Sequence, residues 1–151
     1  MVVSDTYETG ARARTPVHLW IIGVLALLWN MMGAFDYLAT KLQLDFYMSR
    51  FSEEQLAYFY GFPAWVVSAW AFAVWGALAG SVGLLLRRKW SVWAFVVSTA
   101  GMVVTTIYNF GMSNCAEVMG LGAMVFSGII WVISIFLLAY SWFLAKKGIL
   151  V

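Results

Sequence analysis

The chain has 151 residues, of which 64% are hydrophobic and 11% charged, and its formal net charge is +2. Soluble domains are about 45 to 50% apolar and about 25% charged, so this composition excludes an ordinary soluble protein. Long apolar segments take up most of the length, and we therefore expect one domain and no separate soluble catalytic unit.

The N-terminus combines a polar tail with the start of an apolar segment. Residues 1–14 lack hydrophobic periodicity, so we expect a flexible cytoplasmic tail, followed by a membrane domain over 15–151. Thr15 is a suitable N-cap and Pro16 a suitable first helical residue for a segment over 17–40. A signal peptide is the alternative, but this run exceeds an h-region of about 7 to 15 residues and lacks a cleavage site at the usual distance. We therefore expect an uncleaved first helix.

Three further apolar segments follow, over 63–86, 91–111 and 121–145. All four segments are near or above the roughly 18 to 20 residues that cross a bilayer core of about 30 Å. Short connections make consecutive helices antiparallel. The sequence therefore predicts an all-α integral membrane protein, an up-down-up-down four-helix bundle in the lipid bilayer of the cell inner membrane.

The long connection between the first two spans carries a helix signal of its own. Ser52 followed by Gln55 three residues later is a capping-box pattern, which predicts a short interfacial helix over 52–60. Its aromatic residues favour anchoring at the membrane boundary, with ligand recognition as the alternative. The last connection, MSNCAEVMG, is expected to have no structure of its own.

The second span carries small residues at spacings of four and three, which place them in one stripe along the helix. Such stripes let helix backbones approach closely in lipid. We interpret this one as an internal helix contact, with a homodimer face as the alternative. The helix-packing residues are Ala69, Ala73, Gly76, Gly80 and Gly83.

Polar residues inside the spans are the best functional indicators in this sequence. Asp36 shares a helix face with Trp29 and Gly33, and a carboxylate within a membrane span marks a functional site by default. The alternatives are a solvated helix end or a structural hydrogen bond to Tyr108 or Asn109. Asn30, Asp36, Tyr108 and Asn109 are expected in the outer half of the bilayer. The candidate substrate-binding residues are Trp29, Asn30, Asp36, Tyr37, Tyr108 and Asn109.

The residue inventory argues against an enzyme. A single cysteine, Cys115, cannot form an intramolecular disulfide relay, and a single histidine, His18, cannot supply a two-histidine haem site. The sequence also lacks a phosphate-binding loop and a nucleophile elbow. We expect no cofactor, no metal site and no nucleic-acid partner.

Several segments together carry a family resemblance: LLWNMMGAFDYLAT, EEQLAYFYGFPAWVVSAWAFAVWGALAGS, LLLRRKWSVWAF and FGMSNCAEVMG. They resemble a group of small, uncharacterised four-span membrane proteins of proteobacteria, some of which carry the label of sugar transporter. The resemblance implies the four-span topology and a role in transport. The residues that fall in the family pattern are Trp29, Asn30, Gly33, Asp36, Tyr37, Tyr60, Pro63, Trp75, Gly76, Tyr108, Asn114, Glu117 and Gly120.

Two functional hypotheses follow from the sequence. The first is a transporter or permease component for a small polar solute, which at this size needs a second copy because alternating access usually uses two moving halves. The second is a non-catalytic accessory or scaffold subunit of a membrane complex. The expected partners are the lipid bilayer together with a second copy of the chain or another membrane protein.

Basic residues are distributed unequally between the two sides of the expected bundle. Seven of the nine lie before the first span, between the second and third spans, or after the fourth, and only Lys41 and Arg50 lie in the other connections. The positive-inside rule then places both termini in the cytoplasm.

This distribution gives a topology prediction. A reporter fused after Val151 should read as cytoplasmic, and one inserted near Gln43 should read as periplasmic, because Lys and Arg are retained on the cytoplasmic side. Activity of paired cytoplasmic and periplasmic reporters measures this. The reverse pattern, or three crossings, would contradict the four-span topology.

Overall fold

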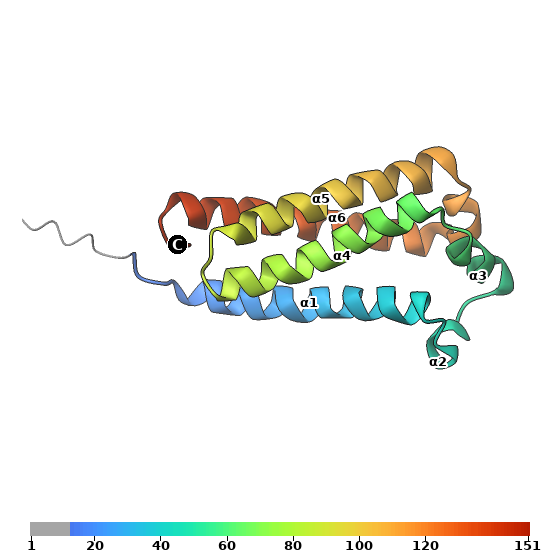
Figure 1. Ribbon diagram of the computed structural model, residues 1–151, viewed down its shortest axis with the longest axis horizontal. Coiled ribbons are helices and arrows are strands. Elements are labelled where there is room, and N and C mark those ends of the chain that lie inside the picture. The colour runs from blue at the N-terminus through green and yellow to red at the C-terminus, as the bar shows by residue number, and fades with distance from the viewer. Residues whose placement is uncertain (1–12) are drawn as a thin grey trace, which may run out of the picture.

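The computed structural model describes residues 13–151, and 82% helix with no strand in this range confirms the all-α class. Most of the predicted tail, residues 1–12, lies outside the described part of the chain. Figure 1 shows the long helices lying alongside one another, with two short helices gathered at one end. The helices are α1 (Val17–Lys41), α2 (Asp45–Met48), α3 (Glu53–Tyr60), α4 (Ala64–Leu85), α5 (Trp90–Ile107), a π-helical turn η1 (Tyr108–Met112) and α6 (Cys115–Lys146).

Four helices are long and apolar enough to cross a membrane: α1, α4, α5 continued by η1, and α6. This indicates a multi-pass membrane protein, and the expected spans agree closely with the first three of these helices. The short helix expected over 52–60 is also confirmed, since α3 begins after Ser52. The Ser52 hydroxyl accepts a hydrogen bond from the Gln55 amide, and the Gln55 side chain accepts one from Ser52 N–H.

The fourth helix differs from the expectation at its start. Cys115 opens α6, so most of the connection expected to be without structure is helical. The Asn114 carbonyl accepts hydrogen bonds from Glu117 and Val118 at 3.0 and 3.1 Å, which begins the helix early. Gly120, with φ 75° and ψ −179°, then interrupts it. Only glycine adopts this backbone conformation readily, so one residue separates the first turn from the long helix.

The centre of the bundle is the contact between α4 and α5, with α1 packed on α4 and α6 packed mainly on α5. The small-residue stripe of α4 faces α5, as the internal-contact interpretation expects. Ser98 on α5 donates a hydrogen bond to the Ala73 carbonyl at 2.6 Å, and Ser91 donates one to the Gly80 carbonyl at 2.9 Å. A Cβ atom added at Gly76 would lie 3.0 Å from the Ala94 carbonyl oxygen. The two backbones are therefore in direct contact.

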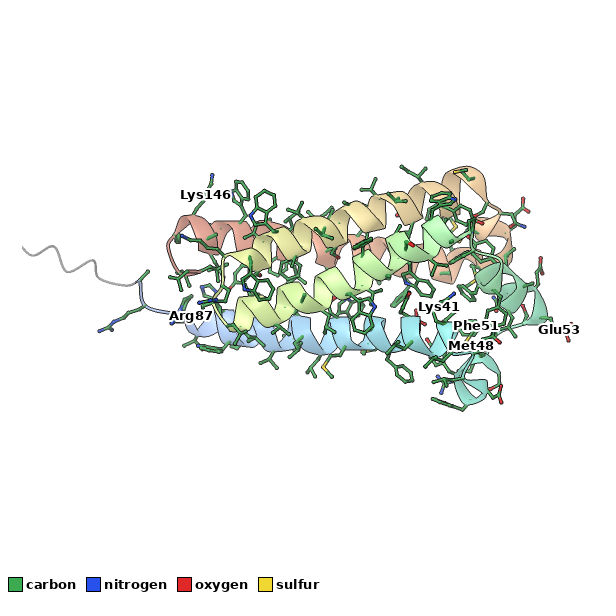
Figure 2. All side chains as sticks on the ribbon, in the orientation of Figure 1. Lys41, Met48, Phe51, Glu53, Arg87 and Lys146 are labelled. Carbon is green, nitrogen blue, oxygen red and sulfur yellow. The ribbon has the colours of Figure 1, made fainter. Side chains whose placement is uncertain are left out.

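The basic end of the molecule is the end that holds Arg14, Arg87, Arg88, Lys89, Lys146 and Lys147. Here the chain after α6 pairs with the turn between α4 and α5: Lys89 N–H donates to the Val151 carbonyl at 3.0 Å, and Val151 N–H to the Arg87 carbonyl at 2.7 Å. Leu150 is fully buried beside Leu19 from α1. Figure 2 shows Arg87 and Lys146 at this end and Lys41 and Glu53 at the other.

The α4 to α5 contact gives a stability prediction. A Cβ atom at Gly101 would lie 2.5 Å from the Ala69 carbonyl oxygen and 2.7 Å from Ala73 N, and both are backbone atoms that cannot rotate away. Gly101→Ala should therefore lower the free energy of unfolding by about 1 to 3 kcal/mol, as overpacking does. Thermal or denaturant unfolding in detergent measures this.

Gly33→Ala is the matched control, because a Cβ atom at Gly33 meets nothing within 4 Å. This change should be neutral or stabilising by up to about 1 kcal/mol, since alanine restricts the unfolded chain more than glycine does. Equal effects of the two substitutions would show that α4 and α5 are not packed backbone to backbone.

Candidate functional site

The acidic end of the molecule, opposite the basic end, is built from α2, α3, η1 and the first turn of α6. It holds Asp45, Glu53, Glu54 and Glu117. Aromatic rings join these elements in edge-to-face pairs, which is the favoured geometry for aromatic contacts. Phe62, between α3 and α4, is central to them, with its ring centroid 5.2 Å from Tyr58, 5.6 Å from Tyr108 and 6.1 Å from Trp70. This packing fixes where the polar side chains of the acidic end lie.

Asn30 and Trp29 make contacts between helices. The Asn30 side-chain amide donates hydrogen bonds to the Ser81 hydroxyl at 2.8 Å and to the Ala77 carbonyl at 3.4 Å, which joins α1 to α4. The Trp29 ring lies 6.0 Å from that of Phe126 on α6. Both side chains therefore hold helices together.

Tyr37 and Tyr108 belong to the aromatic packing. The Tyr37 ring meets Trp70 edge to face, with centroids 4.9 Å apart, and lies 6.3 Å from Trp75. Tyr108 meets Trp65 in the same way at 5.6 Å. These rings join α1 and η1 to α4.

Asn109 lies on the π-helical turn and contacts α3. Its side-chain oxygen accepts a hydrogen bond from the Tyr58 hydroxyl at 2.8 Å, and the same hydroxyl lies 2.9 Å from Ser113 Oγ. Burial raises the pKa of the Tyr58 phenol. Tyr58 therefore stays a neutral hydroxyl that holds α3 against the end of η1.

Asp36 has a hydrogen-bond partner that the sequence analysis did not identify. Its carboxylate accepts a hydrogen bond from the Tyr47 hydroxyl on α2 at 2.5 Å, rather than from Tyr108 or Asn109. Burial, and then the hydrogen bond and charge of Asp36, raise the pKa of Tyr47 to about 12. The carboxylate thus fastens the single turn α2 to the end of α1.

No hydrogen bond or ring contact among residues 13–151 joins two of the six candidate residues to each other. Asn30 bonds to α4, Asp36 to α2 and Asn109 to α3, while the three aromatic candidates pack against other rings. Each of the three polar candidates has a protein partner.

A cavity of about 280 Å³ lies elsewhere at the acidic end, between the end of α1, α2 and α3. Small-molecule sites span about 300 to 1,000 Å³, so this cavity suits a small solute. Its lining combines a carboxylate, an amide, hydroxyl groups, a ring and two apolar side chains. The lining residues are Gln43, Asp45, Met48, Ser49, Leu56 and Tyr60. We call this cavity the α2–α3 pocket.

The sequence analysis missed the α2–α3 pocket because α2 has only four residues, which is too short for a periodic pattern. The available signal was Asp45, an acidic residue in the first turn of that helix. Tyr60 was noted only as part of the family resemblance and of the expected interfacial helix.

No protein-family model, curated protein or solved structure matches this chain. The described residues contain no group of three or more His, Cys, Asp and Glu side chains arranged to hold a metal ion. The α2–α3 pocket is consequently the feature from which a function can be argued.

The Asp36 to Tyr47 contact gives a prediction. Tyr47→Phe removes the donor and leaves the half-buried carboxylate without this hydrogen bond, so stability should fall by about 1 to 3 kcal/mol. Asp36→Asn retains an acceptor oxygen for the Tyr47 hydroxyl and should fold. Thermal unfolding of the three proteins at neutral pH measures the difference.

Alkaline titration tests the same contact. Since the folded pKa of Tyr47 is raised from 10.0 to about 12, the stability that it contributes is present below about pH 10 and is lost as pH rises towards 12. The Tyr47→Phe protein should not show this loss of stability at alkaline pH. A normal phenol titration, with no difference between the two proteins, would mean that Tyr47 is not held by Asp36.

Proposed function

We propose that this chain is a component of a transporter or permease of the bacterial inner membrane, and that the α2–α3 pocket binds a small polar solute. The four long helices cross the membrane up, down, up and down, with both termini in the cytoplasm. The α2–α3 pocket then opens to the outer side, because it lies at the acidic end, opposite the end that holds most of the basic residues.

The observation that carries this proposal is the lining of the α2–α3 pocket. Asp45 supplies a carboxylate and Gln43 an amide. Tyr60 supplies an aromatic side chain beside the apolar Met48 and Leu56. Hydrogen-bonding groups placed beside apolar side chains can orient a small polar molecule. A cavity of about 280 Å³ has room for a small solute.

A second copy of the chain would complete a transport pathway, and α6 supports this part of the proposal. It is the least buried of the four long helices. A Cβ atom added at Gly122 or Gly128 would meet nothing within 4 Å, so these glycines are uncovered in the single chain. Glycines at open helix faces allow close approach of another helix in lipid.

The low burial of α6 also supports the second hypothesis, an accessory or scaffold subunit. In that case another membrane protein covers α6, and the α2–α3 pocket has no solute. Purification separates the two hypotheses. A stable dimer of this chain supports the transporter component, and an obligatory foreign partner supports the accessory subunit.

Solute binding is tested on the full chain in lipid nanodiscs. Thermal unfolding is followed with a panel of small sugars, amino acids and organic cations. A solute present at about 100 times its Kd should stabilise the protein by about 2.7 kcal/mol. Ser49→Trp should abolish the effect, because the indole fills the α2–α3 pocket.

Phe46→Trp is the matched control, because Phe46 lies three residues before Ser49, is exposed and does not line the pocket. The stabilisation should persist in this variant. Absence of saturable stabilisation by every solute would contradict the transporter proposal and leave the accessory subunit as the better hypothesis.

A further inference from the structure

Three of the long helices end in the same backbone motif. After α1, α4 and α6 the chain turns through a residue in the left-handed conformation, with φ of 51° at Gln43, 55° at Arg87 and 70° at Gly148. Glycine is the usual residue there, because a Cβ atom makes this conformation unfavourable. Gln43 and Arg87 therefore occupy backbone positions that glycine would fill at lower free energy.

The hydrogen bonds show that the motif is complete in each case. At the end of α1, Gln43 N–H donates to the Thr40 carbonyl at 3.2 Å and Leu44 N–H to the Ala39 carbonyl at 2.9 Å. The equivalent pairs follow α4 and α6. This is the Schellman arrangement, in which the left-handed residue satisfies carbonyl groups of the last turn.

The side chains of the two unusual residues differ in their surroundings. The Arg87 guanidinium donates a hydrogen bond to the Thr15 hydroxyl, so this side chain has a structural role at the basic end. The Gln43 side chain is exposed and lines the α2–α3 pocket. A ligand in the pocket would come within reach of that amide.

The charge around the α2–α3 pocket indicates the class of ligand. Among residues 13–151 the acidic end and the adjoining end of α1 carry five acidic residues and two basic ones, a net charge of −3: Asp36, Asp45, Glu53, Glu54 and Glu117 against Lys41 and Arg50. The only charged group in the lining is the Asp45 carboxylate. Negative potential concentrates cations, and the face of a Tyr60 ring attracts them at short range.

We propose that the α2–α3 pocket binds a small organic cation, with Asp45 as its charge partner and Gln43 as a specificity-determining hydrogen-bonding contact. This rests on the proposed function, because it names the solute class of the same pocket. In this proposal glutamine rather than glycine occupies the left-handed position at 43, despite its conformational cost, because its side chain contacts the ligand.

The charge partner is tested by measuring affinity for ethanolammonium and tetramethylammonium, with glucose as the neutral comparator, on the full chain in nanodiscs. Both cations should bind saturably and glucose should not. Asp45→Asn should weaken binding of both cations about tenfold or more, because the Coulomb attraction of the carboxylate is lost. Glu54→Gln removes the same charge outside the pocket lining and should change the affinity much less.

Gln43→Gly tests the second contact with two readouts. The melting temperature should rise, because glycine relieves the left-handed residue, while cation affinity should fall about three- to tenfold with the lost hydrogen bond. Ethanolammonium should lose more affinity than tetramethylammonium, which has no donor. Arg87→Gly makes the same backbone change at the basic end and should leave cation affinity unchanged.

The outcomes are distinguishable. Unchanged cation affinity in Gln43→Gly would overturn the role of Gln43. Glucose binding as tight as cation binding, or an Asp45→Asn variant with unchanged affinity, would overturn the cation assignment and leave the polar-solute function standing. Absence of binding by all small solutes would overturn both proposals.

Discussion

Direct backbone contact between α4 and α5 is the constraint on which the rest of this bundle depends. Lipid is as apolar as leucine, so helices in a membrane gain little from burying apolar side chains and need close packing and hydrogen bonds instead. Gly76 and Gly101 provide the close approach, and Ser91 and Ser98 donate across the contact to carbonyls of α4. Those carbonyls have a second lone pair available besides the one used within the helix.

The outer two helices attach to this pair with fewer polar contacts. α1 is joined to α4 by Asn30, and α6 is joined to α5 by the Trp131 indole, which donates to the Thr106 hydroxyl at 3.0 Å. At the acidic end, aromatic rings replace small residues as the packing element. The bundle is therefore closely packed at its centre and held by rings where the short helices α2 and α3 cover it.

The overall fold was predictable because it depends on properties of short, continuous stretches of sequence. The length of an apolar run defines a span, and Ser52 with Gln55 defines the start of α3. The early start of α6 was not predictable in this way, because it depends on Asn114 accepting hydrogen bonds from residues that also suit a loop. The break at Gly120 is visible only in the backbone angles.

The site was less predictable than the fold for a related reason. Asp36 was identified as a notable carboxylate, but its partner Tyr47 follows eleven residues later, beyond a turn whose direction the sequence does not reveal. The α2–α3 pocket forms where three chain segments meet, and none of them carries a ligand-binding motif. The polar residues within the spans proved to make contacts between helices. The α2–α3 pocket is lined instead by the connection between α1 and α4, which lies outside the spans.

The hydrogen bond between Arg87 and Thr15 has a mechanical consequence for α1. It holds the first helix at the basic end, while the other end of that helix continues into the long connection that contains α2 and α3. The 25 residues of α1 make a rigid lever about 37 Å long, so a tilt of about 5° about its fixed end moves Lys41 by roughly 3 Å. That displacement is about the width of a water molecule. The Asn30 hydrogen bonds to Ser81 and to the Ala77 carbonyl, in the middle of α1, oppose such a tilt and so hold the α1 side of the α2–α3 pocket in place.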